Sequence, residues 1–374
     1  MEIVIYCIAV VILYYCIHIG LLIYGVSKVA VFEFKLSQVS PLVEFTLVIP
    51  FKNEEANLES LLNSISQLNY DKLSYEVILV NDSSTDLSTQ IINSWRFKNP
   101  YVQLTILDNV VVSKSSKKDA ITRAISIAKH NWILTSDADC ILPIELLNCY
   151  SEFLVANSTK KFIIGGVSIS NHNQFVSIYQ VLDILSLQAV TIGSFGIDEA
   201  FMCNGANLAF TKQIFNSVNG YTDVNYIASG DDVFLLQKVL QYNPQSVGYL
   251  LSSDSVVKTK PVSTWKQVII QRARWGKKAI AYKTLYPKIL GVVSILANFC
   301  LIVLFLGLFI DGYLAVCAAL ILLKFCFDIV FLSYASRCIN KQLLIYFPLS
   351  FVIYPFLMIL ISLRMVFSSN NWIK

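Results

Sequence analysis

The stretch Trp-Ile-Leu-Thr-Ser-Asp-Ala-Asp occupies residues 132–139 and ends in two aspartates one residue apart, Asp137 and Asp139. Its apolar half predicts a β-strand, and ligands of open α/β sheets bind beyond the carboxyl ends of such strands. Mg²⁺ and Mn²⁺ prefer carboxylate and phosphate oxygens, and Mg²⁺ typically takes one or two carboxylates with a substrate's phosphates. The stretch therefore predicts an α/β sheet with a metal and diphosphate site at its edge. Two aspartates after a strand are also common in solvated turns, so the prediction depends on other segments.

Strands and helices alternate on both sides of this stretch. The expected strands are 45–49, ended by Pro50, then 75–80, 102–107 and 132–135. Between them, apolar residues recur at helical spacing after Asn53, around 91–95 and over 117–129. Such alternation is typical of a βαβ nucleotide-binding fold, which places Asp82, Lys117 and the two aspartates on one rim.

The apolar residues of this 374-residue chain, 55% of the total, are concentrated at its two ends. Four runs are each long enough to cross a bilayer as a helix: 3–26, 289–310, 313–334 and 343–367. The composition therefore excludes an ordinary soluble enzyme. We expect a transmembrane anchor at 1–27, an α/β domain at 40–285 and a membrane domain with three helices at 289–368.

Basic residues cluster on one side of the apolar runs, with Arg364 and Lys374 as exceptions, which favours a cytoplasmic position for the α/β domain and outside positions for both termini. The clustered residues are Lys28, Lys35, Lys277, Lys278, Lys283, Lys288, Arg337 and Lys341. The net charge of +4 suits contact with anionic lipid headgroups rather than nucleic acid. The nine cysteines show no metal-ligand spacing, so we expect neither a disulfide framework nor a zinc site.

Five short motifs follow one another in a fixed order: 48–54, 81–86, 137–139, 230–232 and 271–275. As a set they resemble the family 2 glycosyltransferases, which are inverting enzymes with a GT-A nucleotide-sugar-binding fold. More narrowly, they are similar to the membrane-embedded members that carry a Q-x-x-R-W motif. The resemblance covers about residues 44–280.

The resemblance implies a role for each matching position. Contacts to the nucleotide sugar are expected from Pro50, Glu54, Asp82, Lys117 and Asp137. The metal, Mg²⁺ or Mn²⁺, is expected on Asp139 and Asp137. The sugar and acceptor pocket is expected to include Gly205, Asn207 and Asp231. The catalytic residues are expected to be Asp232 as general base, with Gln271, Arg274 and Trp275 closing over the diphosphate and acceptor. This chain departs from the family pattern at Asn81, Ser83, Ser116 and Asp231, which leaves the specificity for the donor's nucleobase open.

The reaction that the resemblance implies needs few groups. A single displacement at the anomeric carbon requires one base for the acceptor hydroxyl and positive charge on the departing diphosphate. We expect transfer from a nucleotide sugar, UDP-linked as is typical of the family, to a lipid or lipid-linked glycan at the cytoplasmic membrane face.

Three alternatives stay open to different degrees. The Q-x-x-R-W motif favours a processive polysaccharide synthase, although four spans are few for a pore unless the protein oligomerises or has a partner protein. Retention of Asp137, Asp139 and Asp232 disfavours a catalytically inactive membrane scaffold. A transporter is disfavoured because the apolar runs show no inverted repeat.

Lys324 and Asp328 lie one helical turn apart within the third apolar run. Charges inside a membrane span raise the hypothesis of a functional role, here contact with a lipid phosphate. A mutually neutralising pair on one helix is the simpler interpretation, and we favour it.

Overall fold

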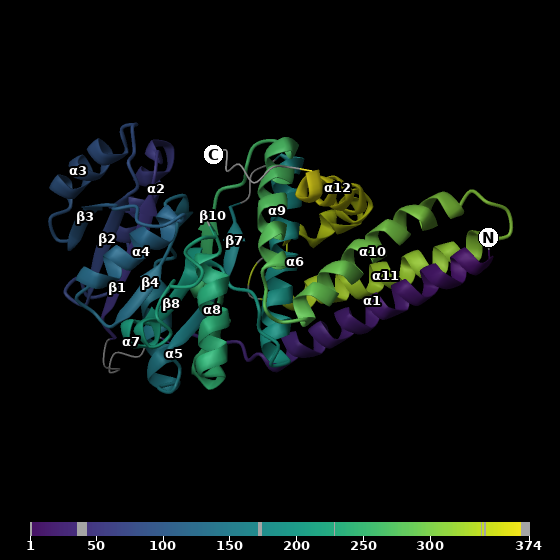
Figure 1. Cartoon of the computed structure of the whole chain (residues 1–374), viewed down its shortest axis with the longest axis horizontal. Helices are drawn as coiled ribbons and strands as arrows, with labels where there is room; N and C mark the ends of the chain where they lie inside the picture. Colours follow the sequence, from purple (N-terminus) through teal and green to yellow (C-terminus); the bar gives the residue numbers. More distant parts are fainter. Residues whose placement is uncertain are drawn as a thin grey trace. The chain divides into compact units, whose positions relative to one another are not determined.

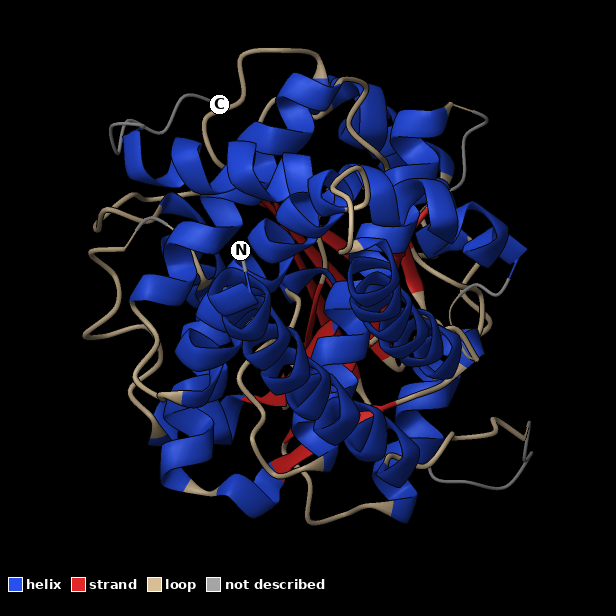
Figure 2. Cartoon of the chain, turned by 90° about the vertical axis from the view of Figure 1, so that its right-hand side faces the viewer, coloured by secondary structure: helices blue, strands red, loops and turns tan. Residues whose placement is uncertain are grey.

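The computed structural model describes residues 2–35, 43–170, 174–227, 229–337, 339 and 342–367 (Figure 1). The chain forms two compact units. The sheet unit comprises 30–170 and 202–260, and the helical unit comprises 1–29, 171–201 and 261–374. Residues 171–201 and 261–285, which the sequence analysis included in the α/β domain, thus cluster with the apolar helices. Among the described residues, every strand lies in the sheet unit (strands are red in Figure 2).

The sheet unit is built on a seven-stranded sheet with the order β3-β2-β1-β4-β8-β6-β9. Its strands are β1 (Phe45–Phe51), β2 (Tyr75–Asn81), β3 (Leu104–Asp108), β4 (Trp132–Thr135), β6 (Phe162–Gly165), β8 (Leu208–Thr211) and β9 (Val247–Leu250). The first four strands are parallel, and β8 runs antiparallel to both β4 and β6. A smaller sheet has the order β5-β10-β7, made by Cys140–Ile141, Val257–Thr259 and Val167–Ile169. The expected α/β class is confirmed.

Strand β1 does not end at Pro50, as the sequence predicted, but continues to Phe51. Its pairing with β4 stops at Val48, whereas its pairing with β2 continues to Phe51. Beyond Val48 the strand is therefore paired on one side only, and a proline without an N–H is tolerated at such an edge.

Helices cover both faces of the large sheet. Helices α2 (Glu55–Ser66), α3 (Ser88–Lys98) and α5 (Leu146–Ala156) pack in one apolar core with alternate residues of β1 and β2, such as Leu47 and Val77. Helix α4 (Ser116–Ile127) contacts the same two strands, but its buried residues lie outside that core. Because side chains alternate along a strand, α4 covers the opposite face. Two more helices, α7 (Lys212–Ser217) and α8 (Asp231–Tyr242), complete the unit with short 3₁₀ turns at Gly205–Asn207, Pro244–Ser246 and Ser253–Ser255.

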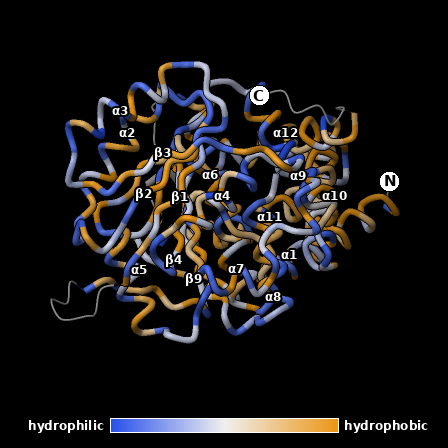
Figure 3. Tube along the Cα trace, turned by 60° about the vertical axis from the view of Figure 1, so that its left-hand side comes forward, coloured by the Kyte–Doolittle hydropathy of each residue, from blue (hydrophilic) through white to orange (hydrophobic). Residues whose placement is uncertain are grey.

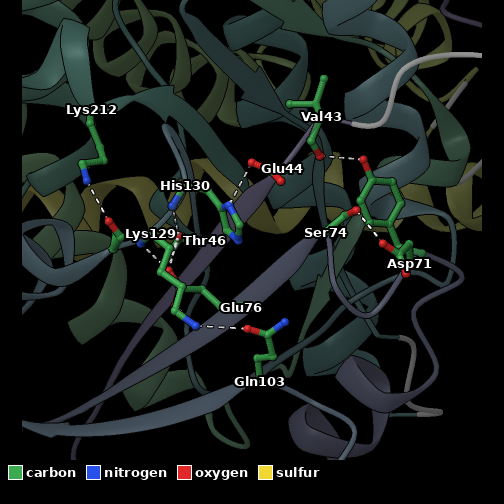
Figure 4. A network of polar contacts seen from close by, with 12 residues as sticks. Val43, Glu44, Thr46, Asp71, Ser74, Glu76, Gln103, Lys129, His130 and Lys212 are labelled. Carbon is green, nitrogen blue, oxygen red and sulfur yellow. Dashed lines mark hydrogen bonds and ion pairs between the residues drawn. The ribbon is translucent and has the colours of Figure 1, made fainter.

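A polar network joins the starts of β1, β2 and β4 (Figure 4). The buried Glu76 carboxylate accepts hydrogen bonds from Thr46 Oγ1 at 2.7 Å and from the Lys129 backbone N–H at 2.6 Å. Lys129 Nζ lies 3.9 Å from Glu76 Oε2 and donates to Gln103 Oε1 at 3.1 Å. The network therefore fixes the amino-terminal ends of the parallel strands, at the edge opposite the expected site.

Within its described residues, the helical unit contains five helices that are long and apolar enough to cross a membrane: α1 (Glu2–Lys28), α6 (Phe175–Gly196), α10 (Tyr286–Gly307), α11 (Leu314–Ala335) and α12 (Phe347–Phe367). The first turns of α1, beside the label N, are orange in Figure 3, the colour of apolar residues. The amphipathic helix α9 (Trp265–Ile280) and a 3₁₀ turn (Gln342–Tyr346) complete the described elements of this unit.

Helix α6 differs from the other four in burial and in chain topology. In its 18-residue apolar window, 78% of the residues are buried, against 22–39% in the windows of the other four helices. Its preceding strand β6 and its following strand β8 pair with each other in one sheet. A single crossing by α6 would put these paired strands on opposite sides of the membrane, so α6 is a packed interior helix. Among the described residues, the structure thus has one more long apolar helix than the four that the sequence predicted.

Close backbone contact joins α1 and α6. A Cβ atom on Gly25 would clash with the Gly193 carbonyl oxygen, and one on Gly196 would clash with the Gly25 carbonyl oxygen. Small residues at a helix interface allow such an approach in membranes. These glycines therefore fix α6 against the N-terminal helix.

Lys324 and Asp328 form the expected ion pair, with 2.6 Å between Nζ and Oδ2. Tyr15 Oη on α1 donates to Asp328 Oδ1 at 2.7 Å, and the Lys324 ammonium lies 4.6 Å from the centre of the Tyr15 ring. Lys324 is 2% exposed. The pair is thus neutralised within the protein and links α11 to α1.

Candidate functional site

The loops after β1 and β2 interlock at the carboxyl edge of the sheet. Thr85 N–H donates to Asn53 Oδ1 at 2.8 Å, and Asn53 N–H donates to Ser84 Oγ at 3.0 Å. Asn53 and Ser83 adopt left-handed backbone conformations, with φ of 52° and 60°. Asparagine takes this conformation more readily than most residues. The two loops therefore form one cradle that holds Glu54 and Asp82.

Asp82, directly after β2, is buried and has two polar neighbours. Its Oδ1 accepts from Asn109 Nδ2 at 2.8 Å, and its Oδ2 faces Lys52 Nζ at 4.0 Å. The sequence analysis missed Asn109. Its position after β3, at the same edge as the other ligating loops, was the available signal.

Lys117, in the first turn of α4, lies between two groups of carboxylates. Its Nζ is 2.7 Å from Asp137 Oδ1 and 3.2 Å from Asp231 Oδ2. Burial lowers the pKa of Lys117, but the surrounding carboxylates, Asp137 foremost, raise it by more, so the pKa lies well above its usual value. The ammonium is therefore fully charged at neutral pH and joins the D-x-D segment to the start of α8.

Asp139 lies in a pocket of negative charge. Burial, followed by the charges of Asp137 and Glu54, raises its pKa to about 6. Within the described ranges, no three His, Cys, Asp or Glu side chains converge to hold a metal unaided. A donor set of one or two carboxylates, of which Asp137 also contacts the Lys117 ammonium, fits a divalent ion whose remaining ligands come from phosphate and water.

Gly205 brings the acidic start of α8 close to the sheet. Its N–H donates to Asp232 Oδ2 at 3.1 Å, while a Cβ at this position would lie 3.0 Å from Asp231 Oδ2. The Thr135 hydroxyl donates to the Gly205 carbonyl at 2.7 Å and anchors the turn to β4. Asp232 also accepts from Val233 N–H at 2.8 Å, at the helix N-terminus, where the helix dipole favours an anion.

Asn207 has a different surrounding from the sugar pocket that the sequence predicted. Its side chain is 0% exposed, and its Oδ1 accepts from Tyr150 Oη at 2.9 Å. Both of its amide hydrogens are engaged, by the carbonyls of Gly166 and Ser255 at 2.8 Å each. Asn207 therefore holds three segments of the sheet unit together, and its amide has no hydrogen left for a sugar.

The Q-x-x-R-W segment lies on α9, in the helical unit. Arg272, which the sequence analysis did not single out, is buried and pairs with Asp183 of α6. It also donates to Gln271 Oε1 at 2.5 Å and stacks over the Trp275 ring with 4.2 Å from Cζ to the ring centre. Arg274 is exposed. Two of the three predicted residues of this motif are thus oriented by a neighbouring arginine.

The sheet unit brings most of the predicted site residues together at one edge. Lys117, Asp137 and Asp231 are in direct contact, and Gly205 and Asp232 adjoin them. Pro50 lies in β1 beside Val80. A cation held among carboxylates at the end of a parallel sheet, next to a carboxylate at a helix N-terminus, suits binding of a nucleoside diphosphate and removal of a proton from an acceptor.

The profile of Glycosyl transferase family 2 matches residues 46–169, and that of Glycosyl transferase family group 2 matches residues 132–366. The chain is 25% identical over 242 residues to a "Probable glycosyltransferase" of Sulfolobus acidocaldarius, covering 63% of this chain and 50% of the relative. It is 22% identical over 246 residues to the poly-beta-1,6-N-acetyl-D-glucosamine synthase of Staphylococcus aureus strain COL, covering 64% and 55%. The chain thus spans about half the length of these curated relatives.

Among solved structures, the chain is similar to the mannosyltransferase PcManGT of Pyrobaculum calidifontis in complex with GDP-Man and Mn²⁺. The TM-score is 0.58 at 17% identity, covering 97% of this chain and 99% of that chain. At this identity the likeness shows the GT-A fold. Since the profile of Glycosyl transferase family group 2 covers more than half of the chain, the chain belongs to the family 2 group of glycosyl transferases.

Proposed function

We propose that the protein is an inverting, metal-dependent transferase that moves a sugar from a UDP-sugar to a lipid or lipid-linked glycan at the cytoplasmic membrane face. The observation that carries the proposal is the contact of Lys117 with both Asp137 and Asp231. Through this contact, one cation joins the segment expected to bind the donor diphosphate to helix α8, which bears the expected general base.

The environment of Asp82 supports uracil as the base. Its Oδ1 is engaged by Asn109, which leaves Oδ2 as the oxygen that faces a ligand from beside Lys52. Uracil offers one ring N–H to a carboxylate, whereas guanine offers two adjacent donors. A carboxylate with one oxygen engaged therefore suits uracil better.

Asp139 and Asp137 would hold the divalent ion together with the donor diphosphate. A bound Mg²⁺ or Mn²⁺ would supply positive charge for the departing phosphate oxygens. Lys117 adds charge from the protein side, since its high pKa keeps it protonated. Proteins that bind such ions usually leave ligand positions to water and substrate, which suits the small carboxylate set here.

Asp232 would act as the general base. The Gly205 N–H and the Val233 N–H hold its two oxygens in place, so little reorganisation is needed when an acceptor hydroxyl approaches. One correctly placed base typically contributes about 10²–10⁴-fold to the rate.

The four candidate spans support a membrane-embedded acceptor. If the four spans cross the membrane in alternating directions, one side carries both the connections to the sheet unit and most of the basic residues that flank the spans. These basic residues are Lys28, the four lysines between 277 and 288, and Arg337. Positive residues favour the cytoplasmic side, so the donor, a cytoplasmic metabolite, would reach the site directly. Lys341, which the sequence analysis counted with them, lies outside the described residues.

A processive polysaccharide synthase is the second candidate, because one relative is a poly-beta-1,6-N-acetyl-D-glucosamine synthase. Product length separates the two. A ladder of products from a single acceptor would indicate processive synthesis, and a single added sugar would indicate the proposed transfer. A partner protein or a second copy would be needed to complete a pore from four spans.

Nucleotide release by detergent-purified protein tests the proposal. UDP-GlcNAc, UDP-glucose and GDP-mannose are offered with Mn²⁺, Mg²⁺ or EDTA, each with membrane lipid extract as acceptor. We expect metal-dependent release from a UDP-sugar that Asp139→Asn and Asp232→Asn abolish, while Lys129→Met at the opposite edge of the sheet retains it. Release only from GDP-mannose would overturn the assignment of uracil as the nucleobase of the donor. Release by Asp232→Asn at the wild-type rate would overturn the assignment of Asp232 as the general base. No release under any condition would favour the inactive scaffold.

A further inference from the structure

The segment that leads into the proposed base, described at residues 218–227 and 229, is a succession of turns and bends between α7 and α8. Three of its residues adopt left-handed backbone conformations: Asn219 (φ 55°), Gly220 (φ 46°) and Asp223 (φ 72°). Its own backbone hydrogen bonds close single turns, such as Val224 N–H to Tyr221 O at 3.1 Å and Ile227 N–H to Val224 O at 3.2 Å. We call it the α7–α8 loop.

Lys118 of α4 holds this loop from inside the sheet unit. Its Nζ donates to the carbonyl oxygens of Val224 at 2.7 Å, Ile227 at 2.8 Å and Ser229 at 3.2 Å. The ammonium also lies 5.2 Å from the centre of the Phe234 ring on α8. Lys118 is 1% exposed, so it is among the largest fully buried side chains of the described residues.

A buried ammonium is costly unless its donors are matched. An ammonium has three N–H donors, and three loop carbonyls accept from this one. The geometry of the loop and the charge of Lys118 therefore depend on each other: without the ammonium, three buried or half-buried carbonyls lose a partner.

The loop ends where the proposed chemistry begins. Gly230, in a left-handed conformation with φ 78°, connects it to Asp231 and Asp232 at the start of α8. The preceding residue of α4, Lys117, contacts the Asp231 carboxylate at 3.2 Å. Two successive lysines thus act on successive parts of one segment, one on its backbone and the other on its carboxylate.

We infer that Lys118 is a positioning residue for the general base: its ammonium sets the path of the α7–α8 loop and so the place of Asp232. The inference rests on the proposed role of Asp232. It assigns Lys118 no contact with donor, metal or acceptor, which separates it from Lys117.

A second lysine provides a matched control. Lys238 of α8 donates to the carbonyls of Gly220 at 2.8 Å and Thr222 at 2.9 Å, at the end of the same loop remote from Asp232. Lys238→Met removes these two contacts to loop carbonyls, compared with the three that Lys118→Met removes. If any loosening of the loop were sufficient to impair the reaction, both lysine variants would behave alike.

The test compares Lys118→Met, Lys238→Met and Asp232→Asn with the wild type, using the UDP-sugar that the wild type turns over and the same lipid extract. We expect Lys118→Met to lower kcat by about 100-fold, the size of effect that a displacement of about 1 Å produces, with the donor KM changed less than about threefold. Lys238→Met should keep kcat within about threefold of the wild type. Hydrogen exchange should increase at 224–232 in Lys118→Met and not around the D-x-D segment.

Each outcome decides the inference. Unchanged kcat in Lys118→Met, or equal losses in both lysine variants, would overturn it and leave the proposed function standing if Asp232→Asn is inactive. An active Asp232→Asn would overturn the proposed base and the inference with it. If Lys118→Met does not accumulate in membranes, Lys118→Gln, which keeps two N–H donors without the charge, takes its place under the same criteria.

Discussion

Lys117 provides the cation on which the carboxylates of the site converge. It is 35% exposed at its side chain, so water and ligands reach it, yet its contacts to Asp137 and Asp231 hold it in place. A lysine in this position serves two purposes. It balances the charge of the carboxylates and, in the proposed function, would be available to a donor diphosphate.

Lys117→Met should lower kcat/KM for the donor by about 100-fold, because one charge that stabilises the leaving diphosphate is lost. The variant should still fold, since methionine preserves the length of the side chain. Nucleotide release measures the effect, and Lys114→Met, three residues earlier, is the control. Wild-type kcat/KM in Lys117→Met would contradict the assignment of this lysine to the donor.

Cys149 in α5 predicts a pH dependence of stability. Burial raises the pKa of its thiol from 9.0 to about 12. Between these values the unfolded chain loses the proton while the folded chain keeps it, so the free energy of unfolding falls as pH rises through this window. Below about pH 9 the contribution is fully present. Cys149→Ala should therefore lose less thermal stability than the wild type between about pH 8 and pH 11.

Thermal unfolding of detergent-purified protein at both pH values measures this difference. Cys7→Ala, which alters an exposed cysteine, is the control and should follow the wild type. An identical alkaline loss in Cys149→Ala and the wild type would contradict the prediction.

Among the elements, the strands of the large sheet have distinct tasks at their two ends. Their carboxyl ends carry the acidic site, and their amino ends are fixed by the network around Glu76 (Figure 4). The polar groups of that network are far along the strands from the expected chemistry. Stability and activity should therefore be separable by mutation.

Glu76→Ala should lower the free energy of unfolding by about 2–3 kcal/mol, because Thr46 Oγ1 and the Lys129 N–H lose a charged acceptor in a buried position. The kcat of the folded fraction should remain that of the wild type. Chemical denaturation and nucleotide release measure the two quantities, and Glu59→Ala on α2 provides the control. A large fall in kcat with unchanged stability would contradict this division.

Helices α6 and α9 are joined by the buried pair Asp183–Arg272. Removing one member leaves an unpaired buried charge at a cost of about 3–5 kcal/mol, whereas replacing both with apolar residues is often neutral. Asp183→Asn should therefore destabilise the protein, and the double variant Asp183→Leu/Arg272→Met should recover stability. The double variant should stay impaired in turnover, since Gln271 and Trp275 have lost the arginine that orients them.

Thermal unfolding and nucleotide release on the same preparations separate the two effects. Recovery of both stability and turnover in the double variant would show that the pair has a structural role only. Failure to recover either would contradict the prediction that the apolar replacement is tolerated.

Several elements were predictable from the sequence because short-range patterns determine them. The apolar runs that become β1, β2 and β4, the aspartates behind them and the four long apolar helices all fall in this group. The packing of α6 and α9 with the apolar helices was not, because helical periodicity does not state which partner covers the apolar face. The role of Asn207 depends on Tyr150, 57 residues away. Nor did the Lys117–Lys118 doublet indicate which lysine is buried.

At the level of the complete chain, the pairing of β6 with β8 predicts that both ends of α6 lie on the same side of a membrane. Cysteine labelling in intact cells tests this. In a Cys7→Ser/Cys326→Ser background, Lys98→Cys in α3 and Glu199→Cys after α6 should react with an impermeant thiol reagent only after permeabilisation. Asp311→Cys, between α10 and α11, should react without it. Labelling of Glu199→Cys but not of Lys98→Cys in intact cells would show that α6 crosses the membrane.

The position of Lys117 also bears on the order in which ligands arrive. A divalent ion that approached Asp137 by itself would meet an ammonium already 2.7 Å from that carboxylate, and repulsion would weaken its hold. A nucleotide sugar brings two negative phosphate charges, which offset most of the three positive charges of the ion and the ammonium. The protein without donor should thus bind free metal weakly and bind the metal complex of the nucleotide sugar as one unit. The cellular concentration of that complex, rather than of the free metal, would then determine how often the site is occupied.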